Sequence, residues 1–165
     1  RHLKKITRGR AAILKACLLR KRKEDYREVS TVSLNEDSNN RAYVLGRLFA
    51  VLEKTQQDAN PGINSTIKDR YFTSACATPG SVFPILFKLY ENHIGKIRKS
   101  ANGKAASIHD EKLVGGLMDK LDVDGNPFPP HLFLDDQSVF VLGYYHQVQS
   151  FFTPKDKRQN HMEEE

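Results

Sequence analysis

The side chains best suited to catalysis or metal binding are thinly spread in this sequence. Its six histidines fall on different predicted elements, and none forms a metal-ligand arrangement with a neighbouring histidine or carboxylate. The carboxylate pairs Asp110-Glu111 and Asp135-Asp136 stand at predicted helix starts, where capping and the helix dipole account for them. A phosphate-binding glycine loop, a nucleophile elbow and a zinc motif are all missing. We therefore predict no catalytic residue, no bound metal and no cofactor, and hence a protein that is not an enzyme.

One acidic loop has the composition of a calcium site. It contains Asp122, Asp124 and Asn126, but its glycine is misplaced for an EF-hand and a phenylalanine occupies the position of the required final glutamate. We expect the apolar side chains that follow to fasten this loop over the core instead: Phe128, Leu132 and Phe133.

Two cysteines complete the set of reactive side chains. Cys17 and Cys76 each lie in an apolar helical pattern and share no metal-binding or redox spacing. We expect both to be buried and reduced.

Positive charge is concentrated at the start of the chain. Residues 1–28 contain eleven lysines and arginines against three acidic residues, whereas the remainder contains fifteen against seventeen. Clustered cations gain affinity for a polyanion by displacing counterions from its phosphates. The pattern therefore favours nucleic acid or an acidic protein as a partner, and a solvated basic helix stays the alternative. A membrane surface is disfavoured because no aromatic residue precedes Tyr26 to anchor such a helix.

Helical periodicity dominates the rest of the sequence and predicts an all-α bundle of five to six helices. The expected helices cover residues 10–22, 40–60, 64–78, 79–99, 107–121 and 135–153. We expect residues 1–153 to form a single domain with a basic N-terminal helix, followed by a disordered tail over 154–165.

The sequence lacks a signal peptide and an apolar run of about 18 residues, so a cytoplasmic protein without a membrane segment is expected.

The helix over residues 40–60 organises the predicted core. Its apolar positions form one stripe, and Asn39 or Asn40 can cap its start. Asn60-Pro61-Gly62 ends it, because proline cannot continue the hydrogen-bond ladder. Gly46 lies in the middle of this helix, which predicts close approach by a neighbouring helix.

Two adjacent tyrosines lie on the last predicted helix. Tyr144 and Tyr145 have the ring faces needed to stack on nucleobases. Their helical spacing favours the alternative, in which the rings pack and the hydroxyls lie at the rim of the core.

Several segments together resemble a known family. They are LGRLFAVLEKTQ (45–56), NSTIKDRYFTSA (64–75), TPGSVFPILFKL (78–89), FPPHL (128–132) and DDQSVFVLGYYHQ (135–147). In this order, they resemble the C-terminal region of the large subunit of the type I-C CRISPR interference complex, Cascade. The small subunit of that subtype looks like the same region produced as a separate chain, and a chain of this length that begins with Arg1 fits the small subunit better.

The resemblance implies a non-catalytic helical bundle that lines the complex in more than one copy. Its implied partners are the backbone and large subunits, the heteroduplex of guide RNA and target DNA, and the displaced non-target strand. The implied function is stabilisation of the R-loop through backbone contacts, because base pairing itself reads the sequence in RNA-guided systems. DNA cleavage would then fall to a separately recruited helicase-nuclease.

Charge alone selects the candidate contacts, since the family motifs are mainly core residues. The local excess of positive charge selects eight residues on the first helix: Lys4, Lys5, Arg8, Arg10, Lys15, Arg20, Lys21 and Arg22. Six further candidates lie on later helices: Arg41, Arg47, Lys68, Arg70, Lys96 and Lys99.

Two other functions stay open at this stage. The basic helix can dock on an acidic subunit surface without touching nucleic acid, which would make the protein an interaction scaffold. A metal-dependent nuclease would need converging carboxylates, and the sequence offers none at a suggestive spacing.

Overall fold

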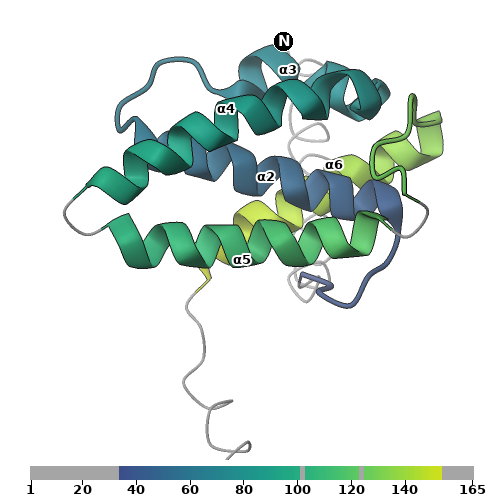
Figure 1. Ribbon diagram of the computed structural model, residues 1–165. Helices are drawn as coiled ribbons and strands as arrows, with labels where there is room; N and C mark the ends of the chain where they lie inside the picture. The colour runs from purple at the N-terminus through teal and green to yellow at the C-terminus, as the bar shows by residue number, and fades with distance from the viewer. Residues whose placement is uncertain (1–33, 101–102, 123–124, 154–165) are drawn as a thin grey trace, which may run out of the picture. The chain divides into compact units, whose positions relative to one another are not determined.

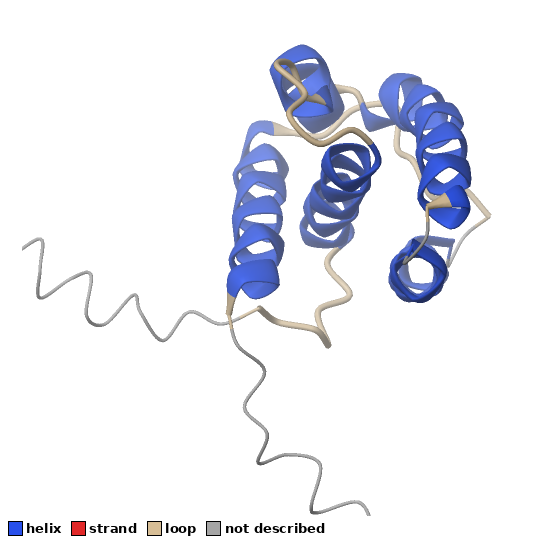
Figure 2. Cartoon of the chain, turned by 90° about the vertical axis from the view of Figure 1, so that its left-hand side faces the viewer, coloured by secondary structure: helices blue, strands red, loops and turns tan. Residues whose placement is uncertain are grey.

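The computed structural model describes residues 34–100, 103–122 and 125–153. These residues form an all-α bundle, and the described ranges contain no strand (Figures 1 and 2). The described helices are α2 (Arg41–Ala59), α3 (Ile67–Ala77), α4 (Pro79–Lys99), α5 (Gly103–Leu121) and α6 (Leu134–Phe152). The predicted basic helix over 10–22, Cys17 and the predicted tail over 154–165 lie outside the described residues.

Helix α2 is the centre of the bundle and contacts each of the four other described helices. Figure 1 shows it running between α4 above and α5 below, with α6 crossing behind it. Every residue from Ala42 to Glu53 is buried. The predicted single buried stripe is therefore wrong, because packing partners surround α2 and bury its polar positions, including Arg47 and Glu53, as well.

Helices α2 and α6 cross at two glycines. A Cβ atom on Gly46 would overlap the carbonyl oxygen of Phe140, and a Cβ atom on Gly143 would overlap the carbonyl oxygen of Tyr43. The predicted close approach at Gly46 is confirmed. Aromatic rings fill the space beside this crossing, where Phe49 makes edge contacts with Phe72, Phe140 and Tyr144.

The ends of α2 and the start of α4 follow the sequence signals. The Asn40 side chain accepts a hydrogen bond from the Tyr43 backbone N–H at 3.1 Å, and Pro79 occupies the first turn of α4. Gly62, with a φ of 79°, follows the end of α2 in the conformation that only glycine adopts without strain.

Helix α3 begins slightly later than predicted. Its cap is Thr66 and not Asn64 or Ser65, because the Asp69 carboxylate reaches back to the Thr66 backbone N–H at 2.8 Å. The Thr66 hydroxyl is free to donate to Glu53 on α2, at 2.8 Å, which ties the start of α3 to the central helix.

Helix α5 begins at Gly103, four residues before the predicted start at Ser107. Gly103 is buried against the carbonyl oxygen of Ile97, where any larger residue would clash, so the turn from α4 into α5 is tight. The helix also continues through Gly115-Gly116, since Val114, Leu117 and Leu121 are buried around them. Packing outweighs the low helix propensity of glycine here.

The loop before α6 is fastened partly as predicted. The Phe128 ring stacks on Phe83 at a centroid distance of 5.1 Å, and Leu132 is buried. Phe133 does not join the core; it is 72% exposed at the N-cap of α6, which begins at Leu134 and not at Asp135 or Asp136. Cys76 is confirmed as a buried free thiol, with its Sγ 3.5 Å from the carbonyl oxygen of Gln137.

Candidate nucleic-acid interface

The sequence-predicted contacts fall into two sets. The eight candidates on the first predicted helix, Lys4 to Arg22, lie outside the described residues. The other six lie on α2, α3 and α4.

Arg47 belongs to the core and not to the surface. It is only 4% exposed, its Nε donates to the side-chain oxygen of Gln147 at 3.0 Å, and its Nη1 donates to the carbonyl oxygens of Asn35 and Glu36. With these acceptors in place, Arg47 joins α2, α6 and the preceding loop, and little of its side chain is left exposed. Charge reasoning does not foresee this burial, because a lone arginine on a helix carries no sequence signal of burial.

A second, partly buried contact fixes the same loop. The Tyr43 hydroxyl accepts from the Asn35 backbone N–H at 3.1 Å and lies 2.8 Å from Nδ1 of His146 on α6. The histidine tautomer sets which of the two groups donates in the contact between Tyr43 and His146. Burial lowers the pKa of His146, which is consistent with the neutral form.

Lys68 is the described candidate with the most distinctive surroundings. Its ammonium lies over three aromatic rings, at centroid distances of 4.7 Å from Tyr144, 5.0 Å from Tyr145 and 5.7 Å from Phe72. It forms no ion pair or hydrogen bond with any described residue, and the neighbouring Asp69 accepts a hydrogen bond from the Thr66 backbone N–H.

The remaining candidates lie nearer the surface. Arg70, Lys96 and Lys99 are exposed, while Arg41 is half-buried at the first residue of α2. Lys96 donates to the Asn60 side chain at 2.9 Å, so the end of α4 meets the end of α2. Charge reasoning left out Arg98, which forms an ion pair with Glu111, and the exposed Lys104 on the first turn of α5.

Glu53 is a buried carboxylate on α2, although it lies outside the apolar stripe of that helix. One of its oxygens accepts from Thr66 at 2.8 Å and the other from the Tyr144 hydroxyl at 2.5 Å. Burial and the hydrogen bond to Glu53 raise the pKa of Tyr144 well above its ordinary range, so the hydroxyl remains a donor. Glu53 therefore holds α3 and α6 against α2.

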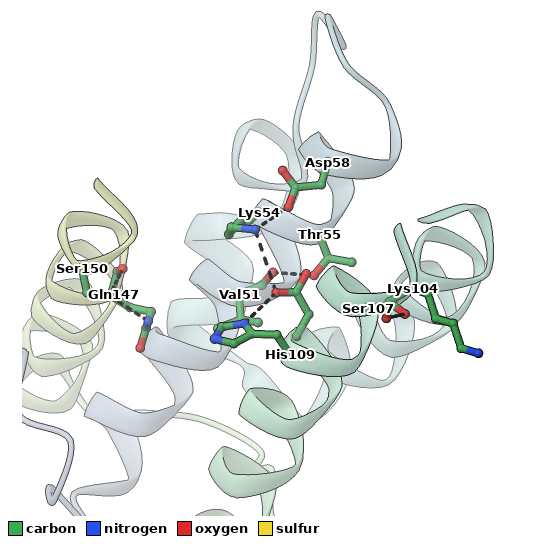
Figure 3. A network of polar contacts seen from close by, with 10 residues as sticks. Val51, Lys54, Thr55, Asp58, Lys104, Ser107, His109, Gln147 and Ser150 are labelled. Carbon is green, nitrogen blue, oxygen red and sulfur yellow. Dashed lines mark hydrogen bonds and ion pairs between the residues drawn. The ribbon is translucent and has the colours of Figure 1, made fainter. Parts of the chain in front are cut away.

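A cleft of about 390 Å³ lies between α5 and α6 beside α2. Asp110 lines it and is 3% exposed, with one carboxylate oxygen 3.9 Å from Lys54 Nζ and 3.5 Å from His109 Nδ1. Figure 3 labels Lys54 on α2 and His109 on α5 and marks these two contacts with dashed lines. The other Asp110 oxygen has no hydrogen-bond partner in the described structure. His109 hydrogen-bonds to no hydroxyl or thiol among the described residues, so the cluster lacks a paired base and nucleophile.

Comparison with protein families decides the identity at a coarse level. A family model described as CRISPR-associated protein (Cas_Csd1) matches residues 1–152. The chain belongs to this Cas_Csd1 family. A comparison with curated proteins gave no match.

The match to this CRISPR-associated family extends over the basic start of the chain and over all five described helices. The described residues themselves contain twelve basic and twelve acidic side chains, so they carry no net charge. No group of three metal-binding side chains gathers within them, and none of the described helices has the length and apolarity to cross a membrane. The excess charge of this Cas_Csd1 protein therefore lies in its first 28 residues.

Proposed function

We propose that this chain is the non-catalytic small subunit of a type I-C Cascade complex. It holds the R-loop by contacting the phosphates of the displaced non-target strand and of the guide–target heteroduplex. The observation that carries this proposal is the Cas_Csd1 match over residues 1–152, taken with the order of segments that resemble the C-terminal region of the large subunit.

The chemistry of the described residues supports a binding role. In an RNA-guided complex, base pairing reads the sequence, so the protein needs cations at the surface and a rigid body behind them. The polar groups inside the bundle meet the second need, since Arg47 and Glu53 tie α2 to its neighbours. Arg70 and Lys99 meet the first, because they are exposed on α3 and α4.

One observation favours a second candidate function, that of a scaffold between protein subunits. Large apolar side chains are exposed along one side of α6: Leu134 (80%), Leu142 (48%), Tyr145 (52%) and Phe152 (82%). Asp135, Ser138 and Gln149 are the other exposed residues of α6, and of these only Asp135, in the first turn, carries a charge. A largely apolar stripe of this kind suits a partner helix better than a phosphate backbone.

The deciding experiment measures binding of the full chain to a single-stranded oligonucleotide and to the matching duplex over about a fourfold range of salt. The proposal predicts sequence-independent binding whose affinity falls steeply as salt rises, because each phosphate contact releases counterions. Binding that is absent, or that does not respond to salt, would contradict it. A scaffold would instead bind the other purified subunits with weak salt dependence.

A further inference from the structure

Tyr144 and Tyr145 are adjacent in sequence but differ in their exposure to solvent. Tyr144 is 3% exposed and its hydroxyl is bound to Glu53, whereas 52% of Tyr145 is exposed. The two rings meet edge to face at a centroid distance of 5.0 Å. The buried ring thus supports the exposed one from behind, and Tyr145 presents a fixed aromatic surface.

Lys68 lies beside this surface without a carboxylate of its own. Its ammonium is 5.0 Å from the Tyr145 ring centroid and contacts no acidic side chain among the described residues. The rings of Phe72 and Tyr144 hold it in place. An ammonium carried by aromatic faces keeps its charge and its N–H donors for a ligand.

We infer that Lys68 and Tyr145 together grip one nucleotide of a single strand, the ammonium on a phosphate oxygen and the tyrosine ring against the base. This inference rests on the proposed function. It adds a binding site and a preference for single-stranded over duplex nucleic acid. Base faces are accessible in a single strand and covered by their neighbours in a duplex, so an aromatic platform selects the unpaired form. The lysine supplies the part of the affinity that depends on salt.

A protein partner that packs on the exposed apolar residues of α6 is the competing occupant of this surface. Lys68 favours nucleic acid over such a partner. Burial of Lys68 in an apolar protein interface would leave its ammonium without a counter-charge. A phosphate supplies that counter-charge.

The test measures binding of the full chain to unstructured single-stranded DNA and to duplex DNA. Tyr145→Ala is expected to weaken single-strand binding about tenfold with little effect on the duplex, and Tyr145→Trp to preserve it. Leu142→Ala is the matched control, since Leu142 is exposed to a similar extent on the same helix. Lys68→Met is expected to reduce the slope of log affinity against log salt by about 0.7, whereas Tyr145→Ala leaves that slope unchanged.

The outcomes separate this inference from the proposed function. If the wild-type chain binds but Tyr145→Ala binds equally well, or loses both forms of DNA equally, the nucleotide grip is wrong and the proposed function stands. If Tyr145→Ala impairs only association with other subunits, the stripe is a protein interface and the grip is again wrong. If the wild-type chain binds neither form of DNA, both fail.

Discussion

At the scale of single residues, the buried polar side chains of α2 explain how the bundle is held together. Glu53 receives hydroxyl hydrogen bonds from α3 and α6, while Arg47 donates to α6 and to the loop before α2. Buried polar groups are costly when unpaired, so these contacts are specific as well as stabilising.

Removal of the hydroxyl should lower the stability of the protein at one buried tyrosine and not at another. Tyr144→Phe removes a hydrogen bond to a carboxylate and should lower the free energy of unfolding by about 1.5–3 kcal/mol. The Tyr90 hydroxyl is buried without a described partner, and burial raises the pKa of Tyr90 to about 12. Tyr90→Phe should therefore leave stability unchanged or raise it slightly. Urea denaturation measures both, and equal losses would contradict the assigned partners.

Arg47 should matter for stability and not for binding. Arg47→Ala leaves the Gln147 side chain and two carbonyl oxygens without their donor and should cost about 2 kcal/mol or more. Arg70→Ala, at an exposed position, should stay within about 0.5 kcal/mol of wild type. The opposite result, with Arg47→Ala weakening DNA binding in a fully stable protein, would restore Arg47 as a contact.

Neutral His146 should make stability fall in mild acid. Its pKa is lowered in the fold from an ordinary value of 6.5, so the unfolded chain takes up a proton first as the pH falls. The contribution of His146 to the free energy of unfolding is complete above about pH 6.5. It declines as the pH falls from that value to the lower pKa of the folded state. His146→Asn should flatten the pH dependence of the free energy of unfolding measured between about pH 7.5 and 5.5. The slope would be reduced and not abolished, because burial also lowers the pKa of His93. An unchanged slope would contradict the neutral assignment.

At the scale of elements, the crossing of α2 and α6 depends on two glycines at one contact. Gly46 and Gly143 each face the backbone of the other helix, so neither has room for a methyl group. The approach brings Phe140 and Tyr144 into the central aromatic cluster.

Alanine at either crossing glycine should force these helices apart. We expect Gly46→Ala or Gly143→Ala to cost about 3 kcal/mol or more, because backbone atoms cannot move aside as a side chain can. Gly115 and Gly116 on α5 are the controls, since a Cβ atom there would meet no atom within 4 Å. Alanine at those positions should stabilise the protein by about 0.5–1 kcal/mol through helix propensity. A thermal melt of each variant distinguishes the two classes, and a mild effect at Gly46 would contradict the close crossing.

At the scale of the whole molecule, positive charge is distributed unevenly along the chain. The described residues are balanced in charge, whereas residues 1–28 carry the excess. Electrostatic affinity for a polyanion should therefore depend mainly on the start of the chain, with the bundle supplying shape.

Two charge-reversal variants test this division. Changing Arg20, Lys21 and Arg22 to glutamate should weaken single-strand binding and reduce the magnitude of the salt slope by about 2, if each cation contacts one phosphate. Reversing Arg70, Lys96 and Lys99, which are exposed on the bundle, should have a smaller effect. Unchanged affinity and slope in the first variant would exclude those three residues as contacts.

The helical class, the start of α4, the ends of α2 and the close approach at Gly46 were all predictable from the amino-acid sequence. Periodicity, capping residues and proline are local signals, and they act over one or two helical turns. The resemblance of five segments to a CRISPR family is also visible in the sequence alone, and the Cas_Csd1 match confirms the CRISPR family.

Which polar residues are buried depends on how the helices pack against one another. Arg47 and Glu53 lie beside the apolar stripe of α2, so residue spacing alone suggests that they are exposed. In the structure, α3, α6 and the preceding loop cover them. The same holds for the tyrosine pair, where contact with Glu53 buries Tyr144 and leaves Tyr145 beside Lys68 at the surface. Burial depends on partners that are distant in the chain, and the spacing of residues on one helix cannot report which partners will pack against each side.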